Sequence, residues 1–149
     1  MRSAPASFAP APYVRVTAWL LASAGTLPFL AAIADAAFLG AGGVGTVQIY
    51  GALIASFICG MHWAAALFAP HSLAVLLFLL SNVGALLAWL AALLAPQPGF
   101  LILAAIFAAL LGIDRHLRVR ELWPDWFWRL RVAISAVVIG ACIWIGLTA

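Results

Sequence analysis

The sequence has very few charged residues, and lysine is absent. Of its 149 residues, 68% are hydrophobic and 7% are charged, whereas a soluble domain is about 45–50% apolar and about 25% charged. A soluble fold of this size would bury only about 70% of its surface. That much apolar surface therefore excludes a soluble enzyme, a nucleic-acid-binding domain and a disordered chain, and the composition indicates an integral membrane protein.

Residues that carry chemistry are also scarce. The two cysteines, Cys59 and Cys142, lie inside apolar runs and form no Cys-x-x-Cys pair, so no metal or redox motif is visible. The sequence contains no phosphate loop, nucleophile elbow, paired acid and base, or cluster of metal ligands. Acidic residues occur only near the ends of the apolar runs. We therefore expect no enzymatic activity, no cofactor and no bound metal.

Five apolar runs are candidates for transmembrane helices, because a span needs about 20 apolar residues to cross about 30 Å of hydrocarbon. The fourth run is the shortest. Long runs without alternating polarity exclude a membrane β-barrel. We predict an all-α integral membrane protein with one domain, a compact bundle of five transmembrane helices and a basic loop over 114–125. The runs cover about 14–34, 47–68, 73–94, 100–113 and 126–147.

The arginines fix the expected orientation of the bundle. With five spans, all seven arginines fall on the side of the N-terminus, and the opposite side has none. The positive-inside rule places that side in the cytoplasm, so we predict a cytoplasmic N-terminus and a periplasmic C-terminus. The absence of lysine and the bias toward alanine, leucine and arginine favour a bacterial inner membrane. The arginines are Arg2, Arg15, Arg115, Arg118, Arg120, Arg129 and Arg131.

His62 is the ionisable side chain that we expect deepest in the membrane. Ionisable residues at such depth are functional candidates by default, and a histidine could relay protons, ligate a haem or metal, or bind a polar head group. It could also be a neutral ring that is hydrogen-bonded within the bundle, since a neutral imidazole has one donor and one acceptor. Counting from the turn near 70 predicts that His62 bonds to Asn82 or Ser81 of the next helix, with Trp63 beside it.

Small and helix-breaking residues predict two further features. Ser56, Gly60 and Ala64 are spaced one turn apart, a pattern that allows close approach of another helix. Pro28 lies within the first span and frees a backbone carbonyl, which Thr26 or a neighbouring helix could satisfy. The proline either shapes a cavity or hinge or is a packing feature.

Charged and aromatic residues are concentrated between 114 and 131, which holds eight of the eleven charges. If this stretch is helical, Asp114 with Arg118 and Asp125 with Arg129 are ion pairs at i,i+4 spacing. The tryptophans predict an interfacial aromatic belt, and the arginines can extend toward lipid head groups. The group either anchors the protein or docks a partner or an acidic lipid. Its members are Trp123, Trp126, Trp128, Arg129 and Arg131.

Several fragments together resemble a domain-of-unknown-function family that includes animal transmembrane protein 69. The resemblance covers about residues 14–148, with Gly84 as a departure where proline is expected. It implies a membrane-embedded helical fold and no established activity. The fragments are Gly25-Thr26-Leu27-Pro28-Phe29, Tyr50-Gly51, Ser56-Phe57, Gly60-Met61-His62-Trp63, Ser81 with Leu86 and Trp89, Asp114, and Pro124-Asp125-Trp126-Phe127-Trp128-Arg129-Leu130-Arg131.

Three functions agree with these patterns. The first is a non-catalytic accessory or assembly subunit of a membrane complex, for example a respiratory one, whose partner is another membrane protein or a second copy of the chain. The second is a small oligomeric transporter or channel lined by His62, Asn82 and Asp35. The third is a binder of a hydrophobic ligand such as a quinone, haem or lipid, using His62, Trp63 and Trp89. In all three the lipid bilayer is a partner and nucleic acid is not.

Overall fold

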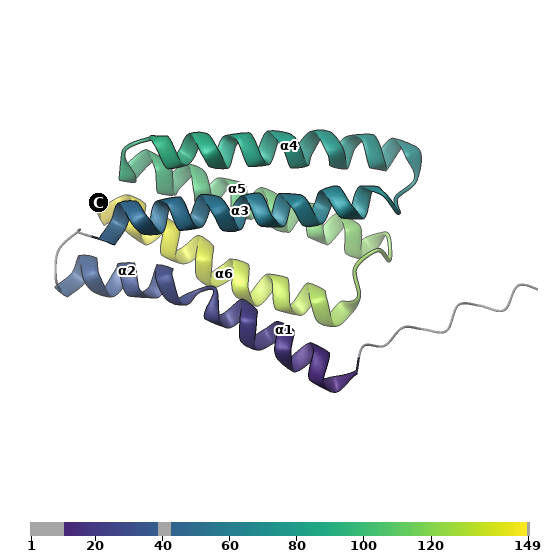
Figure 1. Cartoon of the computed structure of the whole chain (residues 1–149), viewed down its shortest axis with the longest axis horizontal. Helices are drawn as coiled ribbons and strands as arrows, with labels where there is room; N and C mark the ends of the chain where they lie inside the picture. The colour runs from purple at the N-terminus through teal and green to yellow at the C-terminus, as the bar shows by residue number, and fades with distance from the viewer. Residues whose placement is uncertain (1–10, 39–42, 149) are drawn as a thin grey trace, which may run out of the picture.

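The computed structural model describes residues 11–38 and 43–148, without the side chains of 35–38. This part of the chain forms six α-helices and no strands (Figure 1). The prediction of an all-helical fold is confirmed. The helices are α1 (Pro12–Ala24), α2 (Leu27–Phe38), α3 (Val44–Ala66), α4 (His71–Leu93), α5 (Pro96–Val119) and α6 (Asp125–Thr148).

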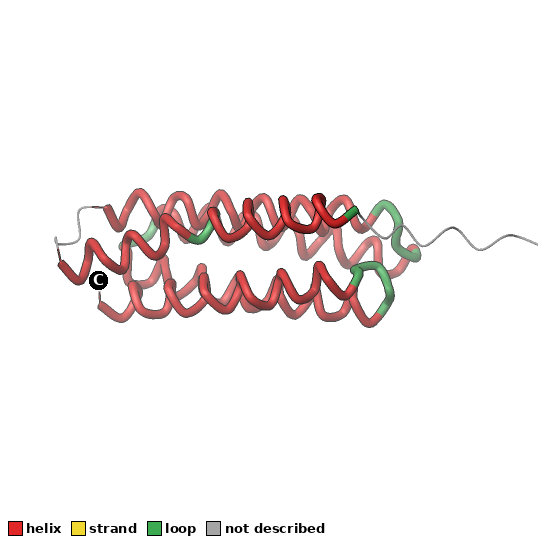
Figure 2. The backbone as a smooth tube through the Cα atoms, turned by 90° about the horizontal axis from the view of Figure 1, so that it is seen from below, coloured by secondary structure: helices red, strands yellow, loops and turns green. Residues whose placement is uncertain are grey.

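Five segments in the described ranges are long and apolar enough to cross a membrane. The first is formed by α1 with most of α2, over Pro12–Ala34, and the others are α3, α4, α5 and α6. Figure 2 shows that the helices run side by side along the long axis of the molecule. The number of spans agrees with the five apolar runs of the sequence.

The fourth span is longer than predicted. α5 continues to Val119, past the expected end at Ile113, so the first part of the predicted loop over 114–125 is helical. The helix tolerates this charged segment because Asp114 is turned into the bundle while Arg115 and Arg118 lie on its exposed side.

α5 ends in a tight turn at Glu121. The amide of Leu122 donates to the carbonyl of Leu117, and the amide of Glu121 donates to that of Arg118. These two bonds form a Schellman motif, with Glu121 at φ 60° in the left-handed region. The turn directs the chain back into the bundle as α6.

The connections gather at two ends of the bundle. The start of α1, the α3–α4 turn and the α5–α6 turn lie at one end, and the α4–α5 turn lies at the other end with the last residues of α6 (Figure 1). We call the first the arginine-rich end, because the arginines at 15, 115, 118, 120, 129 and 131 follow or precede these connections.

The first span is broken between α1 and α2, at Gly25 and Thr26. The Tyr50 hydroxyl of α3 donates to the carbonyl of Gly25 at 3.0 Å, and the Thr26 hydroxyl donates to the carbonyl of Ser23 at 2.8 Å. These bonds go to the carbonyls on either side of Ala24, whereas the carbonyl of Ala24 itself, four residues before Pro28, is the one that proline frees. Beyond the break α2 packs along α3 and buries Phe29, whereas α1 diverges from α3 and buries no residue (Figure 1).

Small residues do bring α3 and α4 together, but not the ones predicted. Gly60 and Ala64 are exposed, and a Cβ atom added to Gly60 would meet no atom within 4 Å in the described structure. The inward face of α3 is instead formed by Ala55 and Cys59. A Cβ atom at Gly84 of α4 would lie 2.9 Å from the Cys59 sulfur, so glycine allows the close approach there. The Ser56, Gly60 and Ala64 pattern therefore marks an outer face of the bundle.

Candidate functional site

Four polar side chains meet inside the bundle near the arginine-rich end. The Asp114 carboxylate is fully buried and accepts hydrogen bonds at both oxygens. Oδ1 accepts from His62 Nε2 at 2.7 Å and from Trp123 Nε1 at 2.9 Å, and Oδ2 accepts from Arg131 Nε at 2.6 Å. We call Asp114, His62, Trp123 and Arg131 the buried charge cluster.

Three helices and one turn supply the cluster. Asp114 continues the buried face of α5, since Leu110 and Leu117 lie four residues before and three residues after it. Arg131 begins the buried face of α6, about 9 Å from the helix start at about 1.5 Å per residue. His62 lies on the inward face of α3 and is 0% exposed. The α5–α6 turn folds Trp123 back over Asp114.

The cluster balances its own charge. Burial of a single ion is costly unless the ion is paired and hydrogen-bonded, and here one carboxylate faces one guanidinium. His62 Nδ1 has no hydrogen-bond partner in the described chain, so the ring needs only its Nε2 proton to bond with Asp114. With a neutral His62 the net charge of the cluster is zero.

The end of the Arg131 guanidinium is not engaged by Asp114. Its Nη2 atom is buried and has no hydrogen-bond partner among the described residues, and the side chain is 9% exposed. Buried polar atoms in folded proteins almost always have a partner, and an unmade bond costs about 1–3 kcal/mol. An unpaired guanidinium donor therefore indicates that a further acceptor can bind here.

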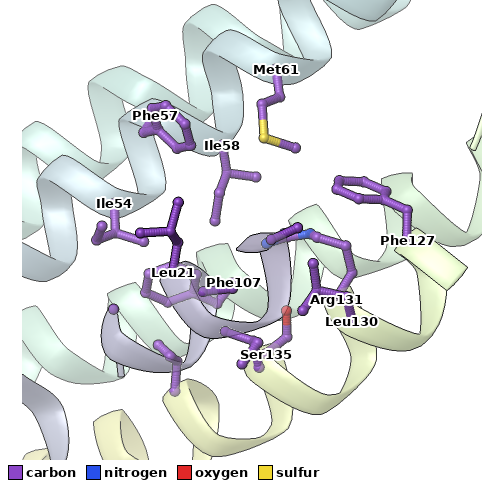
Figure 3. A pocket seen from close by; sticks show the side chains of 15 residues that line it. Leu21, Ile54, Phe57, Ile58, Met61, Phe107, Phe127, Leu130, Arg131 and Ser135 are labelled. Atoms are coloured by element: carbon purple, nitrogen blue, oxygen red, sulfur yellow. The ribbon is translucent and has the colours of Figure 1, made fainter. Parts of the chain in front are cut away.

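The Arg131 side chain lines a cavity of about 390 Å³ between α1, α3, α5 and α6. Figure 3 shows the guanidinium reaching toward the middle of this cavity, with Ile58 and Met61 on one side and Leu130 and Ser135 on the other. Apart from Arg131 and Ser135 the lining residues are apolar, and three are phenylalanines, namely Phe57, Phe107 and Phe127. Ligand pockets are commonly about 300–1,000 Å³, mostly apolar with a few polar groups.

The break in the first span creates the cavity. Because α1, which precedes Gly25, diverges from α3, the two helices do not close against each other near the arginine-rich end (Figure 1). Ala18, Leu21 and Ala22 of α1 line this wall together with Gly25. Three of these four residues are alanine or glycine and leave space that larger residues would fill. The hypothesis that the proline-bearing break shapes a cavity thus agrees with the geometry.

His62 makes an interhelical hydrogen bond as predicted, but the predicted partner is wrong. Its partner is Asp114 of α5, whereas the Ser81 hydroxyl and the Asn82 amide donate to carbonyls of their own helix, at Leu77 and Phe78. In a helix, such local bonds satisfy a polar side chain without a neighbour. Asn82 is exposed.

The other predicted ligand-binding aromatic residues lie outside the cavity. Trp63 is 46% exposed and packs on Phe78, with ring centroids 4.8 Å apart. Trp89 is 62% exposed. The side chain of Asp35 lies outside the described part of the structure.

The predicted ion pairs have different partners. Arg118 bonds Asp125 across the α5–α6 turn at 2.9 Å, and Asp114 pairs with Arg131 instead. The i,i+4 prediction was wrong because Asp114 points inward while Arg118 points outward, and because α6 folds back toward α5.

The residues of the predicted aromatic belt have different roles in the structure. Trp123 belongs to the buried charge cluster, and Trp128 lies under the Arg118 guanidinium at 5.8 Å. Trp126 and Arg129 line a second hollow with Arg15 of α1, on another face of α6. Arg131 alone among the predicted docking residues enters the apolar cavity.

Sequence reasoning missed Asp114 as a site residue, although a signal was present. Asp114 lies at helical spacing from Leu103, Phe107 and Leu110, and the same face continues to Leu117. Extending the fourth apolar run beyond the first charge would have placed the carboxylate on this buried face. No group of three or more histidine, cysteine, aspartate or glutamate residues that could hold a metal occurs within 11–38 and 43–148.

Comparison with protein families matches residues 14–148 to a family described as "Protein of unknown function (DUF3429)". Neither the comparison with curated proteins nor that with solved structures found a match.

Proposed function

The chain belongs to the DUF3429 family, whose description names no function, and we propose from its geometry that it binds a hydrophobic molecule in the cavity. The ligand carries at least one hydrogen-bond acceptor, which meets Arg131. In this proposal the protein is a non-catalytic, multi-pass membrane protein. The apolar wall of the cavity favours a molecule that is dissolved in the bilayer.

The observation that carries this proposal is the position of Arg131 Nη2. This donor is buried and has no partner in the described chain, and it belongs to the side chain that lines the cavity together with one other polar residue, Ser135. Asp114 fixes the guanidinium through Nε, so the remaining donor is held in place before any ligand binds. Preorganised donors of this kind reduce the entropy that binding must overcome.

Native mass spectrometry of the protein released from its membrane tests the proposal. We expect one bound small molecule on the wild-type protein, and its loss in Ala22→Phe, because Ala22 lines the cavity and a phenyl ring would occupy it. Ala24→Phe is the matched control, since Ala24 lies on the exposed side of the same helix. An equal ligand load in both variants would contradict the proposal.

A second candidate function is an accessory or assembly subunit of a membrane complex. Gly60, Gly112 and Gly140 lie on exposed faces of three different helices, and an added Cβ atom would meet no described atom within 4 Å at any of them. Such faces allow close approach of a partner helix. Copurification of a stoichiometric protein in mild detergent would favour this role, which is compatible with ligand binding.

A transporter has less support. The polar residues proposed to line a path do not converge, since Asn82 is exposed and bonds its own helix while His62 is enclosed by its bond to Asp114.

We also propose kinship with animal transmembrane protein 69. It is supported by the sequence fragments named above, which lie within the residues 14–148 that match the family.

We propose a bacterial inner membrane as the location, with the arginine-rich end in the cytoplasm. All described arginines lie toward that end, which is the distribution that the positive-inside rule requires. A phosphatase fused to the C-terminus should then be active in the periplasm, and a fluorescent protein fused there should stay dark. The reverse pattern would show that the C-terminus is cytoplasmic.

A further inference from the structure

We infer that the polar group of the ligand is an uncharged carbonyl, not a carboxylate or phosphate, and that Asp114 imposes this selectivity. The inference rests on the proposed function. It concerns which polar group of a ligand Arg131 bonds, and not whether a ligand occupies the cavity. A carbonyl on an apolar body occurs both in prenylated quinones and in ester lipids.

The first step of the argument is the charge of the site. Arg131 is the only described cationic side chain among the residues that line the cavity, and its charge is already matched by Asp114 at 2.6 Å. An anionic ligand would therefore add an unmatched negative charge next to a buried carboxylate. Burial of an unpaired charge is costly, whereas a neutral acceptor leaves the cluster balanced.

The second step concerns the hydrogen bonds that remain. Nε of Arg131 is engaged by Asp114, which leaves Nη2 as the buried donor without a partner among described residues. A bidentate bond of the kind that arginine makes with carboxylates or phosphates uses two parallel N–H groups. Asp114 engages only Nε, so the Nη1 and Nη2 end of the guanidinium can bond either a carbonyl oxygen or a carboxylate, and the charge of the site decides between them.

The third step concerns the apolar part of the ligand. Ile58, Phe107 and Val138 line the cavity together with Arg131. Val138 lies two helical turns beyond Arg131 on α6, so apolar walls continue from the guanidinium away from the arginine-rich end. A molecule with its carbonyl at Arg131 would extend its apolar body along these walls.

The test compares two probes, methyl oleate and oleate, which have the same acyl chain but differ in charge. Dissociation constants are measured by isothermal titration calorimetry in one detergent and are expressed relative to the probe concentration within the micelles, because oleate and methyl oleate partition differently. We expect the wild-type protein to bind methyl oleate about tenfold or more tightly than oleate, which corresponds to about 1.4 kcal/mol. Decylubiquinone is measured in parallel and shows whether a ring carbonyl or an ester carbonyl is preferred.

Asp114→Asn supplies the decisive variant, because it keeps the size of the side chain and removes its charge. The charge of Arg131 then has no carboxylate to balance it. We expect the ratio of the two dissociation constants to shift in favour of oleate by about tenfold or more. Asp125→Asn is the matched control, since it also removes one acid, but the Asp125 side chain is 74% exposed and pairs with Arg118. Its ratio of dissociation constants should equal that of the wild-type protein.

The outcomes separate this inference from the proposed function. If none of the three probes binds the wild-type protein, the proposed function fails. If oleate binds the wild-type protein as tightly as methyl oleate or more tightly, only the assignment of an uncharged group fails. This comparison needs no variant and holds even if Asp114→Asn does not fold. A ratio that is unchanged in a folded Asp114→Asn variant would contradict the role given to Asp114.

Discussion

Replacing Asp114 with alanine is expected to destabilise the protein by about 3–5 kcal/mol, the usual cost of removing one partner of a buried ion pair. The carboxylate is 0% exposed and accepts hydrogen bonds from His62, Trp123 and Arg131. Its loss would leave the Arg131 charge and two neutral donors without an acceptor. The free energy of unfolding, measured by SDS titration in mixed micelles, checks this value.

A double variant distinguishes the contribution of the buried charge to stability from that of side-chain packing. Buried ion pairs can often be replaced by apolar residues of similar size without loss of stability. We therefore expect Asp114→Leu combined with Arg131→Met to be more stable than Asp114→Ala, because no unpaired ion remains. A double variant as unstable as the single one would mean that packing at Asp114, and not its charge, holds the helices together.

Gly99→Ala is expected to destabilise the protein by about 2–5 kcal/mol, through overpacking and broken hydrogen bonds. Gly99 lies in the first turn of α5, where a Cβ atom would overlap Gln48 Nε2 and lie 2.7 Å from the carbonyl of Ala91. The buried Gln48 side chain donates to the carbonyls of Ala91 and Leu94 at the end of α4. Displacing it would remove the side-chain donor to the carbonyl of Leu94 and one of the two donors to the carbonyl of Ala91.

Gly112→Ala in the same helix is the control for this prediction. A Cβ atom at Gly112 would meet no described atom within 4 Å, and alanine in a helix interior is favoured over glycine by about 0.5–1 kcal/mol. The melting temperature in detergent should therefore fall for Gly99→Ala and stay equal or rise for Gly112→Ala. A similar fall in both would indicate that an outer surface of α5 is packed against something else.

The spans could be predicted from the sequence because they depend on a local property, the apolar run of about 20 residues. The five segments are visible as apolar runs. The signal for a break in the first of them is a different one, the proline at position 28. The end of α5 could not be placed by the same rule. A hydropathy rule ends the span at the first charged residue, Asp114. In the structure, the partners of Asp114 on α3 and α6 allow this residue to lie within the helix and inside the bundle.

The site depends on which face of each helix turns inward, and composition does not determine this. Gly60 belongs to a small-residue pattern, yet it lies on the outer face of α3, while Cys59 beside it faces α4. Likewise Arg129 is exposed and Arg131 is buried, although both were predicted to extend toward head groups. The pairing of His62 with Asp114 joins residues 52 positions apart, and no spacing rule reaches that distance.

Photocrosslinking in the native membrane tests the central claim most directly. A benzophenone amino acid placed at Ile58, which lines the cavity and is 5% exposed, should capture one small molecule of defined mass, with a carbonyl group and no charge. The same amino acid at Leu53, five residues earlier on α3 and 64% exposed, should capture only bulk phospholipids. Identical mixtures of phospholipid adducts at both positions would contradict the account, because they would mean that the cavity holds only bulk lipid.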